Sequence, residues 1–137
     1  LLEQQQKVVS LTAYKVLSVE LAAGLGHTFY DNETDYETVY FDQEIQHDFA
    51  SWVSGDSMEP LYPNGSVALM KQTGFDYDGA VYALIWNGKT YIKKVYREAE
   101  GLRLESINPD YDDLFAPYED EPKIVSIVVG HFLPLEV

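Results

Sequence analysis

Residues 80–97 read AVYALIWNGKTYIKKVYR and carry the clearest structural signal of the chain. Two strand-like segments, residues 80–86 and 89–97, flank the pair Asn87-Gly88. An Asn-Gly pair suits the two central positions of a type I′ turn, because that turn needs a positive φ at both residues. The stretch therefore predicts a β-hairpin.

Further strand-like segments lie on both sides of this hairpin. A period-2 pattern runs through residues 14–21, and the turn signal Pro63-Asn64-Gly65 precedes an apolar run. The strands expected outside the hairpin are residues 14–21, 37–41, 47–53, 67–70, 102–107 and 123–132. The acidic, aromatic stretch 111–122 is expected to be a loop. Since no helical periodicity stands out, we expect a mostly β, compact domain of several antiparallel strands with at most short helical turns.

Composition narrows the classes of function. The 137 residues suit one domain, and the apolar runs are shorter than the roughly 20 residues of a membrane-spanning helix. Cysteine is absent, which excludes disulfides and thiolate catalysis and fits a cytoplasmic protein. The net charge of −14 disfavours direct contact with nucleic acid. We expect no cofactor and no metal, because the three histidines are scattered and the acidic clusters lack the pattern of a calcium-binding loop.

The most distinctive candidate nucleophile is Ser57, which lies within SGDSMEPLY at residues 54–62, after an apolar run and before a turn. A serine needs a base before it attacks an amide, and a lysine can be that base if burial keeps it neutral. Lys93 and Lys94 are adjacent on a predicted strand, so their side chains point to opposite faces and only one can reach Ser57. Alternation alone does not settle which, and no spacing supports a triad with a histidine.

Together, Gly-Asp-Ser-Met-Glu-Pro at residues 55–60 and Tyr-Ile-Lys-Lys-Val at residues 91–95 resemble the Ser–Lys dyad peptidase domain of LexA-like self-cleaving repressors, a family that includes phage repressors and UmuD. The resemblance implies that Ser57 is the nucleophile. It selects Lys93 as the base, because the family has an apolar β-branched residue directly before its catalytic lysine and Ile92 holds that place.

The same resemblance implies a cleavage site and an extended N-terminal cleavage arm. The family cuts itself at an Ala-Gly or Cys-Gly bond upstream of the serine, and Ala23-Gly24 lies upstream of Ser57. The oxyanion formed during cleavage needs backbone donors, and we expect the amides of Asp56 and Ser57 to supply them.

The resemblance also implies a larger protein and its partners. Residues 1–13 are expected to be a linker from an N-terminal DNA-binding domain, and residues 14–137 the self-cleaving and dimerising domain. We expect a homodimeric transcriptional repressor in the cytoplasm that touches DNA only through that other domain. Its activator in the response to DNA damage would be a RecA filament. The alternatives are a UmuD-like self-processing accessory protein, a signal-peptidase-type Ser–Lys enzyme, and a catalytically idle oligomerisation module.

Overall fold

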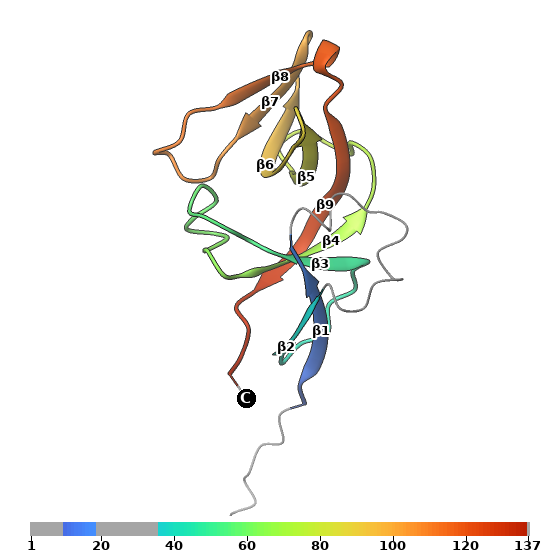
Figure 1. Cartoon of the computed structure of the whole chain (residues 1–137), viewed down its shortest axis with the longest axis vertical. Helices are drawn as coiled ribbons and strands as arrows, with labels where there is room; N and C mark the ends of the chain where they lie inside the picture. Colours follow the sequence, from blue (N-terminus) through green and yellow to red (C-terminus); the bar gives the residue numbers. More distant parts are fainter. Residues whose placement is uncertain (1–9, 19–35, 137) are drawn as a thin grey trace, which may run out of the picture.

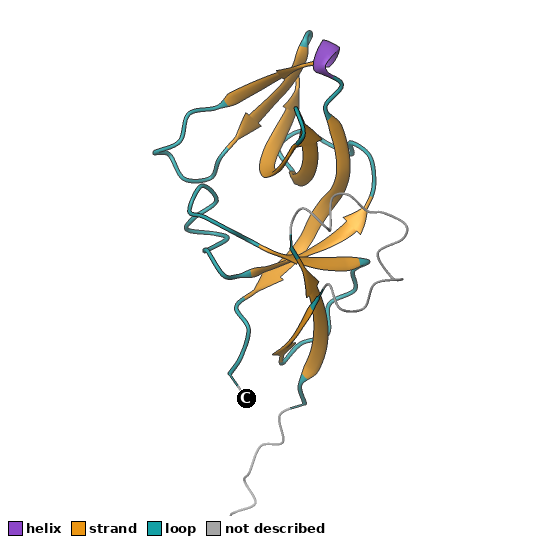
Figure 2. Cartoon of the chain, viewed as in Figure 1, coloured by secondary structure: helices purple, strands orange, loops and turns teal. Residues whose placement is uncertain are grey.

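The computed structural model describes residues 10–18 and 36–136, and within them the chain forms a nine-stranded sheet with one short 3₁₀ turn (Figures 1 and 2). The elements are β1 (Thr12–Leu17), β2 (Glu37–Phe41), β3 (Phe49–Trp52), β4 (Val67–Gln72), β5 (Val81–Trp86), β6 (Lys89–Arg97), β7 (Gly101–Glu105), β8 (Leu114–Pro117), η4 (Tyr118–Asp120) and β9 (Lys123–Phe132). Their order in the sheet is β2-β1-β3-β4-β9-β5-β6-β7-β8. The predicted mostly β fold is confirmed.

The long strand β9 joins the two halves of the sheet. Its residues 126–132 pair with β4, and its residues 123–127 pair with β5 on the other side. In Figure 1, β5 to β8 gather at one end of the molecule and β1 to β3 at the other, with β9 running between them. The two halves are therefore hydrogen-bonded into one sheet, because β9 pairs with β4 in one half and with β5 in the other.

The central hairpin forms as predicted. β5 pairs with β6 in antiparallel register from Val81–Lys94 to Trp86–Lys89. Asn87 has φ 52° and Gly88 has φ 75°, which are the two positive values that a type I′ turn requires. Since a two-residue turn leaves no freedom in pairing, it sets the face on which each β6 side chain lies.

One expectation was wrong: residues 111–122 are not simply a loop, because they contain β8 and η4. β8 is an edge strand that pairs with β7, and of its residues Leu114 and Phe115 are exposed while Ala116 is buried. The usual alternation of apolar and polar residues is therefore missing, and acidic residues on both sides make the segment look like a loop.

Two further differences concern the N-terminal part. β1 begins at Thr12 and ends at Leu17, and it pairs in parallel with β3, whereas we expected antiparallel strands. It lies inside the sheet, between β2 and β3. Ala23 and Gly24 lie outside the described residues.

The core next to the predicted nucleophile draws on both halves of the sheet. Its buried members are Leu17, Phe49, Val53, Met58, Tyr62, Ala68, Met70 and Ala83. Two of them, Met58 and Tyr62, belong to the loop that carries Ser57, so the loop is tied to the strands by apolar packing.

Candidate active site

The loop after β3 holds Ser57 at the surface while its neighbours are anchored. Gly55 takes a φ of 81°, which favours glycine, and its amide donates a 2.8 Å hydrogen bond to the side-chain oxygen of Asn64. Met58 is 2% exposed and packs into the core, and its carbonyl accepts a 2.8 Å bond from the amide of Tyr62. Ser57 itself is partly exposed. The local sequence thus places the partly exposed Ser57 side chain on a tightly held backbone.

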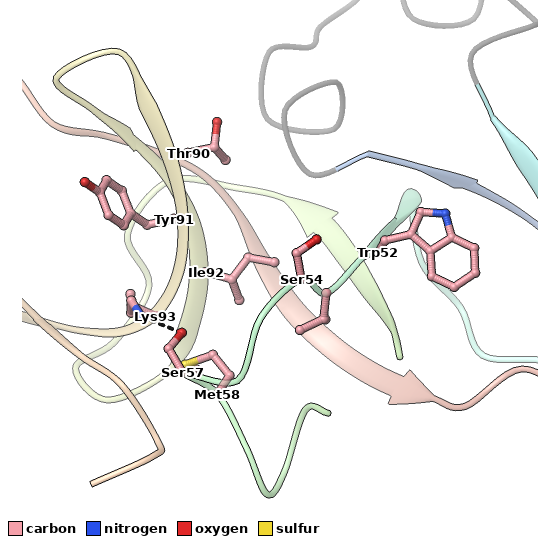
Figure 3. A pocket seen from close by; sticks show the side chains of 9 residues that line it. Trp52, Ser54, Ser57, Met58, Thr90, Tyr91, Ile92 and Lys93 are labelled. Atoms are coloured by element: carbon pink, nitrogen blue, oxygen red, sulfur yellow. Dashed lines mark hydrogen bonds between the residues drawn. The ribbon is translucent and has the colours of Figure 1, made fainter. Parts of the chain in front are cut away.

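Lys93 reaches this hydroxyl from β6. Its Nζ lies 2.8 Å from the Oγ of Ser57, 36 residues away in the sequence (Figure 3). The same Nζ lies 2.8 Å from the Oγ of Ser106. The residue is only 8% exposed, and among the described residues no carboxylate pairs with it. Burial therefore lowers the pKa of Lys93, because no negative charge compensates the loss of water around the ammonium.

Lys94 lies on the opposite face of β6. Its Nζ is 3.5 Å from an Oε1 of Glu105, with both side chains about one-third exposed. Hydrogen bonding to Tyr96 and the nearby Glu105 carboxylate raise the pKa of Lys94. It is a solvated surface lysine, and the structure brings Lys93 rather than Lys94 to Ser57.

The segment after β7 supports the nucleophile loop, a role that the sequence did not reveal. The amide of Asn108 donates a 2.9 Å hydrogen bond to the carbonyl of Ser57, and its side-chain nitrogen donates a 3.0 Å bond to the carbonyl of Asp56. The Tyr111 hydroxyl donates to the Asp56 carboxylate, which raises the pKa of Tyr111. Three hydrogen bonds thus tie this segment to Ser57 and to Asp56, the residue before it.

The predicted oxyanion donors, the amides of Asp56 and Ser57, have no hydrogen-bond partner within residues 10–18 and 36–136. The amides of Asp56 and Ser57 donate no hydrogen bond in the part of the chain that the structure describes, although the carbonyls of both residues accept one from Asn108. Both N–H groups therefore remain available for a hydrogen bond to a substrate oxygen. Their role in catalysis stays a prediction.

A cleft of about 210 Å³ opens at Ser57 and Lys93. Figure 3 shows the side chains of Ile92 and Met58 beside the dyad, with Thr90 and Trp52 further along the same cleft. The cleft is lined by Trp52, Val53, Ser54, Ser57, Met58, Thr90, Tyr91, Ile92 and Lys93. Four consecutive residues of β6, from Thr90 to Lys93, form one wall of this cleft.

The described histidines have other contacts. His47 Nδ1 lies 2.7 Å from the carbonyl oxygen of Ile45, and the ring of His131 stands edge-on to Tyr62 at 4.7 Å. Within residues 10–18 and 36–136 no group of three His, Asp or Glu side chains is arranged to hold a metal ion. Over the same residues, no helix is long and apolar enough to cross a membrane.

The fold and the comparisons define a class of protein. The chain belongs to the Peptidase S24-like family, whose model matches residues 15–129. The repressor protein CI of Enterobacteria phage phi80 is 44% identical over 62 residues, which are 44% of this chain and 26% of that protein. The LexA repressor of Lacticaseibacillus casei is 30% identical over 118 residues, 83% of this chain and 55% of the repressor.

A third relative, the LexA repressor of Citrifermentans bemidjiense, is 31% identical over 86 residues, 61% of this chain and 43% of the repressor. The expected resemblance to LexA-like repressors is confirmed. The chain spans about half or less of the length of these curated relatives.

Proposed function

We propose that this chain is the self-cleaving domain of a LexA-type or phage-type repressor, and that it hydrolyses its own Ala23-Gly24 bond with a Ser57–Lys93 dyad. One observation carries the proposal: a buried lysine, with no carboxylate partner among the described residues, has its Nζ 2.8 Å from the Oγ of a partly exposed serine. Burial favours the neutral amine, and a neutral amine can take a proton from a hydroxyl.

Two side chains of this chain, Ser57 and Lys93, act on the peptide bond between Ala23 and Gly24. Ser57 Oγ attacks the carbonyl carbon of Ala23 while its proton passes to the neutral amine of Lys93. As the C–N bond to Gly24 breaks, Lys93 gives that proton to the leaving nitrogen, and an ester joins Ser57 to Ala23. Water then attacks the ester and its proton passes to Lys93. Ser57 recovers a proton when the ester bond breaks, so the dyad ends as it began.

Charge develops on the carbonyl oxygen in both halves of this reaction. The amides of Asp56 and Ser57 are the donors that we assign to it, since neither has another partner among the described residues. One oxyanion donor is worth about 10²–10³ in rate in serine peptidases. The hydrogen bonds from Asn108 and Tyr111 hold both amides in place and supply no proton to the reaction.

The larger protein is proposed to be a homodimeric cytoplasmic repressor that binds DNA through a domain outside this chain. The net charge of −14 supports this division, because such a surface is repelled by the phosphate backbone. Residues 1–13 would link the two domains. Cleavage after a RecA filament forms on single-stranded DNA would separate DNA binding from dimerisation and relieve repression.

The central test is to incubate the purified chain at mildly alkaline pH and weigh the products by mass spectrometry. We expect two fragments, one ending at Ala23 and one beginning at Gly24. Ser57→Ala and Lys93→Ala should each slow cleavage by at least about 10³-fold, because nucleophile and base act as a unit. Lys94→Ala is the matched control and should keep most of the activity, since its ammonium lies at the surface with Glu105.

Two further experiments test whether one molecule cleaves another and whether RecA stimulates cleavage. A Lys93→Ala chain offered as substrate to the intact chain tests cleavage between molecules. Activated RecA filaments on single-stranded DNA should accelerate cleavage near neutral pH without changing the cut bond. Cleavage that depends on Ser57 but is not accelerated by RecA would contradict only the proposed activator. Fragments cut at another bond would contradict the assigned cleavage site, Ala23-Gly24.

A further inference from the structure

Lys93 has a second hydroxyl partner that the Ser–Lys mechanism does not use. Ser106 Oγ lies 2.8 Å from Lys93 Nζ, the same distance as Ser57 Oγ on the other side. Ser106 and Lys93 are each 8% exposed, so this contact is shielded from water. Hydrogen bonds to both hydroxyls therefore set the position of the Lys93 amine.

The hairpin of β6 and β7 determines that Ser106 faces Lys93. Lys94 pairs with Glu105 and Val95 with Leu104, so one further step of the same register puts Ser106 opposite Lys93. Residues directly opposite in an antiparallel pair share a face, which is why these two side chains meet. Ser106 directly follows the last paired residue of β7, so the end of the β6–β7 ladder sets its position.

A base must point its lone pair at the proton that it takes. A neutral amine has one lone pair and two N–H groups, whereas the ammonium has three N–H groups and no lone pair. When one N–H is donated to Ser106 Oγ, rotation about the Cε–Nζ bond is restricted. The lone pair can then be held toward the Ser57 hydroxyl throughout the reaction.

We propose that Ser106 is a positioning residue, which accepts a hydrogen bond from the Lys93 amine and aims its lone pair at Ser57. The inference rests on the proposed self-cleavage for its consequence in rate, but the contact itself can be tested without cleavage. Ser106 forms no bond with the substrate and exchanges no proton, so it is distinct from the nucleophile and the base.

The proposal predicts two effects of Ser106→Ala that a general loss of structure would not produce together. The rate of self-cleavage is expected to rise with pH as Lys93 loses its proton and then to reach a plateau. In Ser106→Ala this plateau should fall by about 10-fold to 100-fold, because the amine is no longer oriented. The pH profile should also move to lower pH, since a hydrogen bond accepted from the ammonium stabilises its charged form and is lost. The other titratable groups near Lys93 stay in place: the Tyr111 ring 5.9 Å from its Nζ, and Asp56, which is bonded to Tyr111.

Two variants control for the removal of a buried hydroxyl. Ser126 is fully buried on β9, and its Oγ donates to the Met70 sulfur at 3.1 Å rather than bonding to Lys93 or Ser57. Ser126→Ala should therefore leave both the plateau and the pH profile unchanged. Ser106→Thr keeps a hydroxyl at the same position, and it should restore much of the rate that Ser106→Ala loses.

Titration of Lys93 provides a readout that does not need cleavage. The Ser57→Ala chain, labelled with ¹³C at lysine Cε, is titrated by NMR with and without Ser106→Ala, and the Lys93 signal is assigned by its absence in a Lys93→Met chain. A lower Lys93 pKa in the double variant supports the proposal. An unchanged titration, or a Ser106→Ala chain that behaves like Ser126→Ala in cleavage, overturns it while the Ser57–Lys93 mechanism stands. If the intact chain never cleaves itself, the proposed function fails, and the same titration still decides the Ser106 contact.

Discussion

Met58 links the stability of the core to the placement of the nucleophile, so its truncation should affect both. The side chain is 2% exposed in the core beside the active site, and its backbone directly follows Ser57. Met58→Ala removes three side-chain atoms beyond Cβ. At about 0.8 kcal/mol for each buried methylene the transfer cost is about 2 kcal/mol, and the residual cavity brings the total to about 2–4 kcal/mol.

Met70 offers a matched comparison, because it lies in the same core and is 0% exposed but belongs to strand β4. Met70→Ala should cost a similar or larger free energy of unfolding, measured by urea denaturation, because it also removes the sulfur that accepts the Ser126 hydrogen bond. At conditions where both variants are folded, Met58→Ala should slow self-cleavage by about 10-fold to 100-fold, since a small displacement of a reacting group is expensive. Met70→Ala should change the rate by less than about 3-fold.

Met58→Leu keeps most of the volume and should cost less than about 1.5 kcal/mol, which leaves a folded variant to study if Met58→Ala is too unstable. Two results would refute the reasoning. A loss of under about 1 kcal/mol in Met58→Ala would show that the side chain does not anchor the loop. Equal slowing of cleavage in the Met58 and Met70 variants would show that the loop is positioned by other contacts.

Three other outcomes are expected. Because burial lowers the pKa of Lys93 and only its neutral amine is active, cleavage should rise with pH through that pKa and then level off; a profile that follows a group near about 6.5 would indicate a histidine instead. Gly101→Ala should cost about 1–3 kcal/mol or more in urea unfolding, because a Cβ there would lie 2.8 Å from Pro117 Cα, whereas Gly74→Ala points into open space and should be nearly neutral. Ser51→Ala should raise the free energy of unfolding by about 1 kcal/mol, since the Ser51 hydroxyl is buried without a partner in the described structure; a lower urea midpoint would contradict this.

Local signals in the sequence were sufficient for much of the fold. The bounds of β6 and β9 match the expected strands 89–97 and 123–132, and the Asn87-Gly88 turn marks where β6 begins. β8 escaped detection because an edge strand with two exposed apolar residues lacks the alternation of apolar and polar residues, and its pairing depends on a close approach to Gly101. The parallel pairing of β1 with β3 likewise has no local signature.

The candidate active site also combines features set by local sequence with features set by contacts between distant segments. That Lys93 and Lys94 face opposite sides of a strand follows from the chain alone, because the direction of successive side chains is a local property of an extended backbone. Which of them lies beside Ser57 depends on how β6 packs against a loop 36 residues earlier in the sequence. The contacts of Ser106 with Lys93 and of Asn108 with Ser57 also need strand register and loop packing. Such contacts join distant segments, and only the folded sheet brings those segments together.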